Sequence, residues 1–502
     1  MSAFEELRAQ LARIADLERA SALLDWDQET YLPPGGVEDR ANQLATLGGF
    51  THQMFTSERL AGLLESAERE LDGAPQDSFE ASLLRVTRRD HEQALRLPAA
   101  LVEDLARAGA EARPDWLAAR EQKDWSIFQP RLERNVELSQ AVADCHGFEV
   151  SRYDALIERG EPGLSTRRVE ELFEQLKQAV VPMLAAIQER SDRIQDGVLD
   201  RNYDPARQIQ VSLAVIKELG YDFHRGRLDI SQHPFSVAFG PGDVRITTRV
   251  KRNVRDSCLF SCIHESGHAM YDQGVPRDLD RTPLWGGASS GVHESQSRFW
   301  ENLVGRSRPF WRHFFPLLRD AFPAQLADQD AESFYRANNR VRPSYIRVDA
   351  DEVTYNLHVL LRFEIERDLV EGRLGAAEVP EAWNELLARY LGLPPPDLVS
   401  GPLQDIHWVS APLGTFVGYT LGNLISAQLM DRARLDLGDV DALLEAGDFS
   451  PLLAWLRAAV HQHGRMFTPD ELTLRATGAG IGTESWIRYA RAKFGELYDL
   501  SW

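Results

Sequence analysis

Apolar residues recur every three to four positions over most of the chain, which is the spacing of helices that bury one face. The first stripe consists of Leu7, Leu11, Ile14, Leu17 and Ala20, and similar stripes run through 79–158 and 166–197. Glu, Arg, Ala and Leu dominate these segments, and all four are good helix formers. The pattern therefore predicts a mainly α-helical protein.

Short clusters of proline and glycine interrupt the helical stretches, and such clusters mark turns. They lie at 32–36, 161–163, 240–243 and 393–397. No linker is long or low in complexity, and no repeat of solenoid period stands out. We expect a single helical domain over 1–502, with an N-terminal helical half of about 1–225 and a second half of about 226–502.

One segment, 227–250, is rich in β-branched and aromatic residues and follows a different period. In it Val244, Ile246, Thr248 and Val250 alternate with more polar residues, which is the periodicity of a strand. The GPGD turn at 240–243 comes just before this strand. We therefore predict one small β-sheet directly ahead of the most informative motif in the chain.

That motif is CIHESGHAMYDQG, residues 262–274. We predict a helix over about 256–273, capped by Asp256 or Ser257 and ended by Gly274 and the proline that follows. His264 and His268 then leave one face, one turn apart, and Glu265 sits about 100° round the helix. This arrangement supplies two zinc ligands and a base, whereas chance spacing of two hydrogen-bonded core histidines is the alternative.

A catalytic zinc site with an open position needs a third protein ligand. Ser290 can cap a second helix that runs to Gly305, and Glu294 opens this helix 26 residues after His268. We predict Glu294 as the third ligand, with its neighbour His293 as the rival. A carboxylate that merely stabilises a helix start through the macrodipole is the alternative for Glu294.

Composition narrows the function further. The net charge of -21 argues against nucleic acid and anionic membranes as partners. Three cysteines form no disulfide framework, the first residues form no signal-peptide pattern, and no apolar run reaches about 18 residues. We therefore expect a cytoplasmic protein. Cys258 and Cys262 are interpreted as buried apolar fillers, and His461 and His463 as a solvated pair, while His91 has no second histidine at motif spacing.

Several further blocks resemble the M32 metallocarboxypeptidases of the thermostable carboxypeptidase Taq type. In chain order they are WDQET at 26–30 with Arg40 and Gln43, HPF at 233–235, DVRIT at 243–247, HESGH at 264–268, HESQ at 293–296, IRVDADE at 346–352 and GPLQDIHW at 401–408. The resemblance covers most of the chain and is far more specific than a single five-residue motif.

The resemblance implies a nearly all-helical zinc-peptidase fold with a deep groove and a homodimeric assembly. It also implies release of single C-terminal amino acids from peptides, with broad preference and poor tolerance of proline. His264, His268 and Glu294 would hold the metal, which lowers the pKa of a bound water to about 7. Glu265 would then act as general base and acid, and Tyr419 and His407 would stabilise the oxyanion.

The resemblance also makes Arg347 our first choice for binding the substrate's C-terminal carboxylate, because a guanidinium can do so with two prongs. An ion pair with Asp349 or Asp351 is the alternative for Arg347. We interpret Arg245 as structural, with Asp405 as a partner. Asp351 is a candidate acceptor behind the ligand histidines. The predicted strand itself is a candidate edge for adding the substrate backbone.

Three rival functions remain open at this level. A zinc endopeptidase or a dipeptidase of similar fold would use the same metal chemistry, and a non-catalytic peptide-binding protein would not need Glu265. An aminopeptidase is disfavoured because no GxMEN-type block precedes the metal motif. Zn²⁺ is the expected metal, and Co²⁺ or Mn²⁺ also suit nitrogen and oxygen ligands in an open site.

Overall fold

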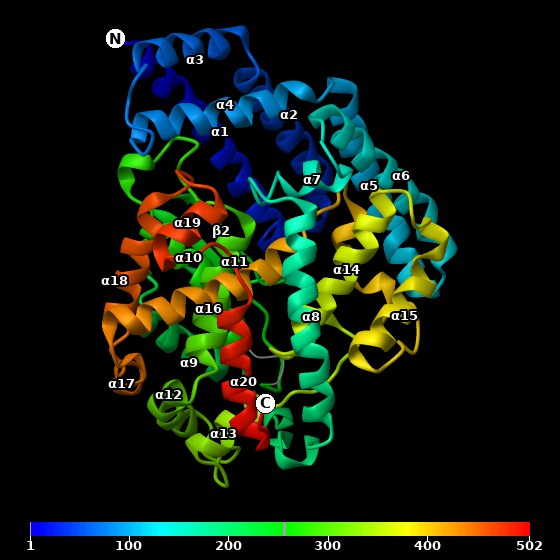
Figure 1. Ribbon diagram of the computed structural model, residues 1–502, viewed down its shortest axis with the longest axis vertical. Coiled ribbons are helices and arrows are strands. Elements are labelled where there is room, and N and C mark those ends of the chain that lie inside the picture. The colour runs from blue at the N-terminus through cyan, green and yellow to red at the C-terminus, as the bar shows by residue number, and fades with distance from the viewer. Residues whose placement is uncertain (1, 255–257) are drawn as a thin grey trace.

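The computed structural model describes residues 2–254 and 258–502, and helices dominate it (Figure 1). Within these residues there are twenty α-helices and one three-stranded sheet, which confirms the predicted fold class. The four predicted breaks all fall outside the α-helices. None of the described helices combines the length and the apolar run that crossing a bilayer requires.

The N-terminal part is a set of nine helices that precede the sheet. They are α1 (Ala3–Thr30), α2 (Val37–Phe55), α3 (Glu58–Glu70), α4 (Phe79–Arg96), α5 (Ala99–Gln122), α6 (Trp125–His146), α7 (Arg152–Ile157), α8 (Thr166–Gln188) and α9 (Pro205–Leu219). Leu7, Leu11 and Ile14 are buried as predicted, whereas Ala20 is exposed. The stripe therefore describes only the first half of α1, because its second half runs towards the sheet and contacts β2.

The sheet consists of β1 (Leu228–Ile230), β2 (Ser236–Gly240) and β3 (Asp243–Thr248) in the order β1-β3-β2. β1 is parallel to β3, and β2 forms an antiparallel hairpin with it through the predicted turn. β3 matches the predicted strand, and Val244 and Ile246 are buried. Because β3 is central, both of its edges are paired, so the prediction that a substrate adds to this strand is wrong.

The remaining helices contain the candidate site. They are α10 (Cys258–Gly274), α11 (Ser290–Arg298), α12 (Arg308–Ala321), α13 (Ala331–Asn338), α14 (Thr354–Val370), α15 (Val379–Leu391), α16 (Val417–Leu437), α17 (Val440–Ala446), α18 (Ser450–Ala459), α19 (Pro469–Thr477) and α20 (Glu484–Tyr498). α11 continues into a π-helix over Phe299–Gly305, so the predicted helix to Gly305 exists with a widened second half. The predicted caps Asp256 and Ser257 lie outside the described residues.

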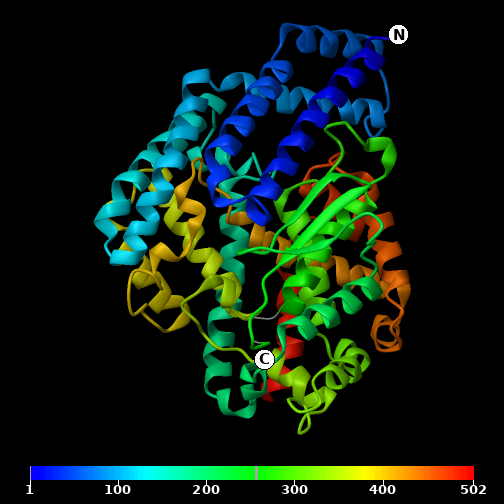
Figure 2. The ribbon, with the colours of Figure 1, turned by 180° about the vertical axis from the view of Figure 1, so that it is seen from behind.

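α10 is the central element of this region, since it packs against the sheet, α9 and α11. α16 in turn lies along the other side of α11 (Figure 1). Seen from behind, the sheet lies next to the first helices of the chain (Figure 2). There the guanidinium of Arg245 lies 4.4 Å from the ring centroid of Trp26, and the Tyr31 hydroxyl donates to Asp229 at 2.5 Å. These contacts fix the end of α1 on the sheet.

Candidate metal centre

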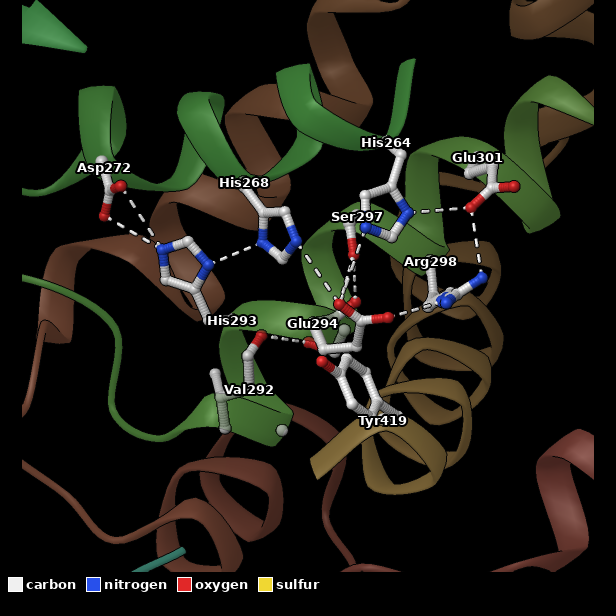
Figure 3. Close-up of polar contacts among 12 residues, drawn as sticks. His264, His268, Asp272, Val292, His293, Glu294, Ser297, Arg298, Glu301 and Tyr419 are labelled. Carbon is white, nitrogen blue, oxygen red and sulfur yellow. Dashed lines mark hydrogen bonds and ion pairs between the residues drawn. The ribbon is translucent and has the colours of Figure 1, made fainter. Parts of the chain in front are cut away.

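Three predicted ligand side chains converge between α10 and α11 (Figure 3). The Nε2 atoms of His264 and His268 lie 3.7 and 3.4 Å from Oε2 of Glu294. Ligand atoms of all three residues lie within 4.8 Å of one another. The two histidines share a face because they are four residues apart on α10, and α11 brings the carboxylate opposite them.

The spacing of these atoms fits a divalent metal. Bonds of about 2.0–2.1 Å in tetrahedral geometry place neighbouring ligand atoms about 3.3 Å apart. The two nitrogen–oxygen separations, 3.4 and 3.7 Å, lie near that value. Two imidazoles and one carboxylate form a donor set that suits Zn²⁺ and also accepts Co²⁺ or Mn²⁺.

Two glycines allow the helices to approach closely enough for this convergence. A Cβ atom on Gly267 of α10 would lie 2.6 Å from the carbonyl oxygen of Gln296 and 2.7 Å from Cα of Ser297. A Cβ atom on Gly422 of α16 would lie 2.5 Å from Cγ of Glu294. Glu294 is thus confined from one side by a bare backbone, which fixes where its carboxylate points.

Glu294 is held by its own helix. Arg298 donates from Nε to Oε1 at 2.7 Å, and the Ser297 hydroxyl donates to Oε2 at 3.2 Å. Burial alone would raise the pKa of Glu294, but the Arg298 guanidinium and the His264 ring hold that pKa well below its usual range. The carboxylate is therefore ionised at neutral pH, as a metal ligand must be.

Behind His264 lies an acceptor that sequence reasoning missed. Nδ1 of His264 is 2.9 Å from Oε2 of Glu301, a residue of the π-helix. Arg298 and Arg306 also donate to Glu301, at 3.3 and 3.0 Å. The prediction of Asp351 for this role is wrong, because its carboxylate instead accepts backbone N–H groups at the start of α14.

Behind His268 lies His293, the residue considered as a rival ligand. The two Nδ1 atoms are 2.6 Å apart, and Nε2 of His293 lies 3.2 and 3.3 Å from the two carboxylate oxygens of Asp272. His293 therefore points at the outer edge of His268 and not at the ligand cluster (Figure 3). The only sequence signal for this arrangement is that Asp272 follows His268 by one further turn on the same face of α10.

Glu265, the predicted base, is 7% exposed and follows His264 directly on α10. Burial raises the pKa of its carboxyl group to about 7, because the neighbouring His264 only partly offsets the loss of water. Its position beside the ligand cluster is the one that the motif predicts.

His407 and Tyr419 lie together on the side of the cluster that α16 provides. Nε2 of His407 is 3.1 Å from the Tyr419 hydroxyl, and Figure 3 shows Tyr419 beside Glu294. Burial lowers the pKa of His407 to about 4, and the nearby guanidinium of Arg347 contributes. His407 is therefore neutral at physiological pH, although its Nδ1 atom lies 3.7 Å from Oδ1 of the ionised Asp405.

Arg347 lies next to this pair, with its guanidinium carbon 4.9 Å from the centroid of the Tyr419 ring. It donates from Nη1 to the Tyr355 hydroxyl at 3.1 Å and from Nε to Asp405 at 3.3 Å. The ion-pair alternative named Asp349 or Asp351, but the partner is Asp405.

A second arginine shares that aspartate, since Arg362 donates to Asp405 from Nε at 2.5 Å. The two guanidinium groups hold the pKa of Asp405 well below its usual range against the effect of burial. The prediction that Arg245 pairs with Asp405 is wrong. Arg245 pairs with Asp243 at 2.8 Å and packs on Trp26, so its structural role stands.

Other residues from the sequence analysis are not part of the cluster. His461 is completely buried and its Nε2 is 3.0 Å from Oε1 of Gln296, so the prediction of a solvated histidine there is wrong. Cys258 and Cys262 are buried with their Sγ atoms 4.0 Å apart, as expected for small core residues.

Comparisons with known proteins identify the family of the chain. The profile described as carboxypeptidase Taq (M32) metallopeptidase matches residues 6–494. The chain is 40% identical to thermostable carboxypeptidase 1 of Thermus thermophilus, with 99% of each chain covered. It is 35% identical to carboxypeptidase 1 of Bacillus subtilis, with 98% of this chain and 97% of that protein covered.

Solved structures give the same result. The crystal structure of the M32 carboxypeptidase from Deinococcus radiodurans R1 matches with a TM-score of 0.96 and 41% identity, covering 99% of this chain and all of that one. The Pyrococcus furiosus carboxypeptidase matches with a TM-score of 0.95 and 34% identity over 98% of this chain and 99% of that one. Fold and sequence therefore agree, and the chain belongs to the carboxypeptidase Taq (M32) metallopeptidase family, a family of metallocarboxypeptidases.

Proposed function

We propose that this metallocarboxypeptidase removes single amino acids from the C-terminus of peptides, with broad preference and poor activity on C-terminal proline. The observation that carries the proposal is the convergence of His264, His268 and Glu294, with Glu265 beside them, in a chain of this family. We propose these three residues as the ligands of one divalent cation, which in our proposal is Zn²⁺, with Co²⁺ or Mn²⁺ as substitutes.

When bound, such a cation lowers the pKa of a water and polarises the scissile carbonyl. Glu265 would take the proton of the attacking water and pass it to the nitrogen of the departing amino acid. Its place on the helix supports this role, because Glu265 directly follows His264 and is not one of the residues whose ligand atoms converge.

Tyr419 and His407 would stabilise the negative charge that develops on the carbonyl oxygen. His407 is neutral, so one ring nitrogen carries a proton. If that nitrogen is Nε2, it donates to the Tyr419 oxygen at 3.1 Å and leaves the Tyr419 hydroxyl proton free to point at the substrate. This pairing supports a donor role for Tyr419 with His407 orienting it.

Arg347 would bind the free carboxylate that distinguishes the end of a peptide. Its place beside Tyr419 supports this assignment, and its bond to Asp405 holds the guanidinium in one orientation. A fixed planar fork loses less conformational freedom on binding a carboxylate than a mobile side chain does.

The central test is Glu265→Gln, which keeps the shape of the side chain and removes the base. We expect kcat to fall by about 10²- to 10⁴-fold with peptide binding retained. The matched control is Glu364→Gln on α14, a carboxylate bonded to Tyr390, which should leave kcat unchanged. Full peptidase activity of Glu265→Gln would overturn the mechanism. An inactive wild-type protein that still binds peptides would favour the non-catalytic alternative.

The exopeptidase assignment is tested by comparing peptides with free and amidated C-termini. We expect cleavage of the free peptides alone, one residue at a time. Arg347→Lys keeps the charge beside Asp405 but loses the two-pronged fork, so it should reduce the preference for free termini on the order of 10-fold. Equal cleavage of both peptides by the wild-type protein would instead identify an endopeptidase, and cleavage of free dipeptides alone would identify a dipeptidase.

We further propose a cytoplasmic homodimer. Three cysteines with free thiols fit a reducing compartment. The dimer is the state implied by the family resemblance, and helix α2 leaves Val37 and Phe50 each 57% exposed, which is apolar surface that a second chain would cover. Light scattering of the purified protein distinguishes a dimer from a monomer directly.

A further inference from the structure

Three residues form a line that leads away from the cluster: His268, then His293, then Asp272 (Figure 3). The nitrogens that join the two rings are 2.6 Å apart, while the ring centroids are 4.7 Å apart and the ring planes differ by 25°. Rings that were stacked face to face could not bring two nitrogens so much closer than their centres. The rings therefore meet edge to edge and nearly in one plane, which is the geometry of an N–H···N hydrogen bond.

The proton on this bond has only one position that is compatible with metal binding. A ligand histidine needs a lone pair on the nitrogen that faces the metal, which is Nε2 of His268, so its Nδ1 must carry the proton. His293 must then accept that proton's hydrogen bond with the lone pair of its own Nδ1. The remaining proton of a neutral His293 is on Nε2, where it faces the two oxygens of Asp272 at 3.2 and 3.3 Å.

The surroundings keep His293 in this orientation. A Cβ atom on Gly287 would lie 2.7 Å from Cδ2 of the ring, so the loop before α11 closes directly over it. On another side the ring of Tyr271 lies with its centroid 5.4 Å from that of His293, and Tyr271 is itself fixed by a hydrogen bond from the Ala288 backbone at 3.2 Å. A ring confined in this way cannot turn its nitrogens away without moving the loop.

We propose that His293 and Asp272 are positioning residues that act on the metal through His268, in an Asp272–His293–His268 relay. The relay selects the tautomer of His268 in which Nε2 is free to bind, and the aspartate makes His293 a stronger acceptor. This inference rests on the metal centre proposed above. It assigns a role to the histidine beside Glu294 that is different from that of a ligand.

The relay also makes the two ligand histidines unequal. His264 is supported directly by the carboxylate of Glu301, which two arginines already neutralise in part. His268 is supported by a neutral ring with a carboxylate one step further out, so its support depends on two side chains and not on one. Removing either His293 or Asp272 should therefore lower the affinity for the metal.

The test measures the affinity for Zn²⁺ alone, by competition with a chelator. His293→Leu removes the acceptor, and we expect Zn²⁺ to bind about 10- to 100-fold more weakly, the usual effect of losing a partner of a ligand histidine. His293→Asn places an amide oxygen near the position of Nδ1 and should recover part of that loss. His461→Gln is the matched control, because His461 is also buried against Tyr271, with ring centroids 4.9 Å apart, yet lies outside the relay.

A double-mutant cycle separates a relay from simple packing. Asp272→Asn should weaken Zn²⁺ binding in the wild-type protein but have no further effect in His293→Leu, because Asp272 acts only through His293. Additive effects, or unchanged affinity in a folded His293→Leu, would overturn the relay. If His293→Leu does not fold, the same cycle with His293→Ala decides. A wild-type protein that binds no Zn²⁺ would instead contradict the proposed metal centre.

Discussion

The two sides of the candidate site are built in different ways. The proposed metal side takes its residues from α10 and α11, and two of its three proposed ligands are one turn apart on a single helix. The proposed substrate side takes Arg347 from a 3₁₀ turn, His407 from another 3₁₀ turn and Tyr419 from α16. The first depends on close helix packing, and the second depends on buried charges that join distant segments.

This difference predicts different weaknesses. On the metal side, Gly267 and Gly422 leave room for the backbone and side chain of α11, so small additions of volume should displace a ligand. On the substrate side, Asp405 is shared by Arg347 and the fully buried Arg362, so loss of one charge should destabilise the fold itself. One site therefore contains a packing-limited part, whose geometry depends on the space between helices, and a charge-limited part, whose stability depends on buried ion pairs.

The largest effect on stability is expected from Asp405→Asn. It leaves two buried guanidinium groups without their shared carboxylate, and breaking a buried ion pair costs about 3–5 kcal/mol. We expect that loss in the free energy of unfolding, measured by urea denaturation of the metal-free protein, with Zn²⁺ affinity nearly unchanged. As a control, Asp441→Asn removes an exposed partner of Arg434 and should cost under about 1 kcal/mol. A strong loss of Zn²⁺ affinity in folded Asp405→Asn would mean that the two sides are coupled.

An intermediate effect is expected from Gly422→Ala. The added Cβ atom would lie 2.5 Å from Cγ of Glu294, and overpacking of this kind costs about 1–3 kcal/mol. The side chain of Glu294 is the group closest to the added methyl, so it would be displaced. We therefore expect Zn²⁺ affinity to fall by about 10-fold or more. Gly62→Ala on α3 is the control, since no atom lies within 4 Å of its added Cβ atom, and it should be neutral or slightly stabilising. Unchanged Zn²⁺ affinity in Gly422→Ala would refute the packing-limited description.

The smallest effect, when counted for each pH unit, is a pH dependence of stability that comes from Glu366 on α14. This buried carboxyl group accepts from the Tyr153 hydroxyl, the Trp408 indole and the Gly414 backbone, but no arginine bonds to it among the described contacts. Burial raises its pKa to about 7, although these donors partly oppose the shift. Between its ordinary pKa and about pH 7, the unfolded chain is ionised while the folded chain keeps the proton.

Stability should therefore fall as pH rises through that window, by at most about 1.4 kcal/mol for each pH unit from this one group. Urea denaturation of metal-free wild-type protein and of Glu366→Gln at pH 5 and pH 8 measures it. We expect the variant to gain stability relative to the wild type on going from pH 5 to pH 8. An equal difference at both pH values would show that Glu366 keeps an ordinary pKa. Asp405 is also buried, but its arginine partners lower its pKa. Comparing the two residues therefore shows how an arginine partner changes the pKa of a buried carboxyl group.

Much of the fold could be predicted from the pattern of the chain. The helical period, the turn clusters and the strand alternation around Ile246 depend on neighbours within a few residues, and the structure confirms them. The alternation of polar and apolar residues does not specify the order of strands in a sheet. It therefore could not predict that β3 is the central strand, with both edges already paired. Pairing between strands is set by contacts that no local pattern contains.

The residues of the candidate site likewise divide into those that the sequence predicted and those that it did not. Spacing on one helix predicted that His264 and His268 lie together. The start of the next helix predicted Glu294, and the resemblance to a family favoured it over its neighbour His293. Reasoning from sequence offered Asp351 as a candidate outer partner of the two motif histidines, whereas the partners are Glu301 and His293. Glu301 lies on a π-helix, and the wider turn moves its side chain to a position that an α-helical count does not give.

By itself, then, the sequence determined the helical class, the place of the small sheet and the spacing of two histidines with a glutamate between them. Each of these follows from periodicity over one or two turns. Tertiary structure alone decided which carboxylate each buried arginine and histidine meets, because a buried charge bonds to whatever lies opposite it across a helix interface. That choice depends on how closely backbones approach, and here Gly267 and Gly422 set the distance.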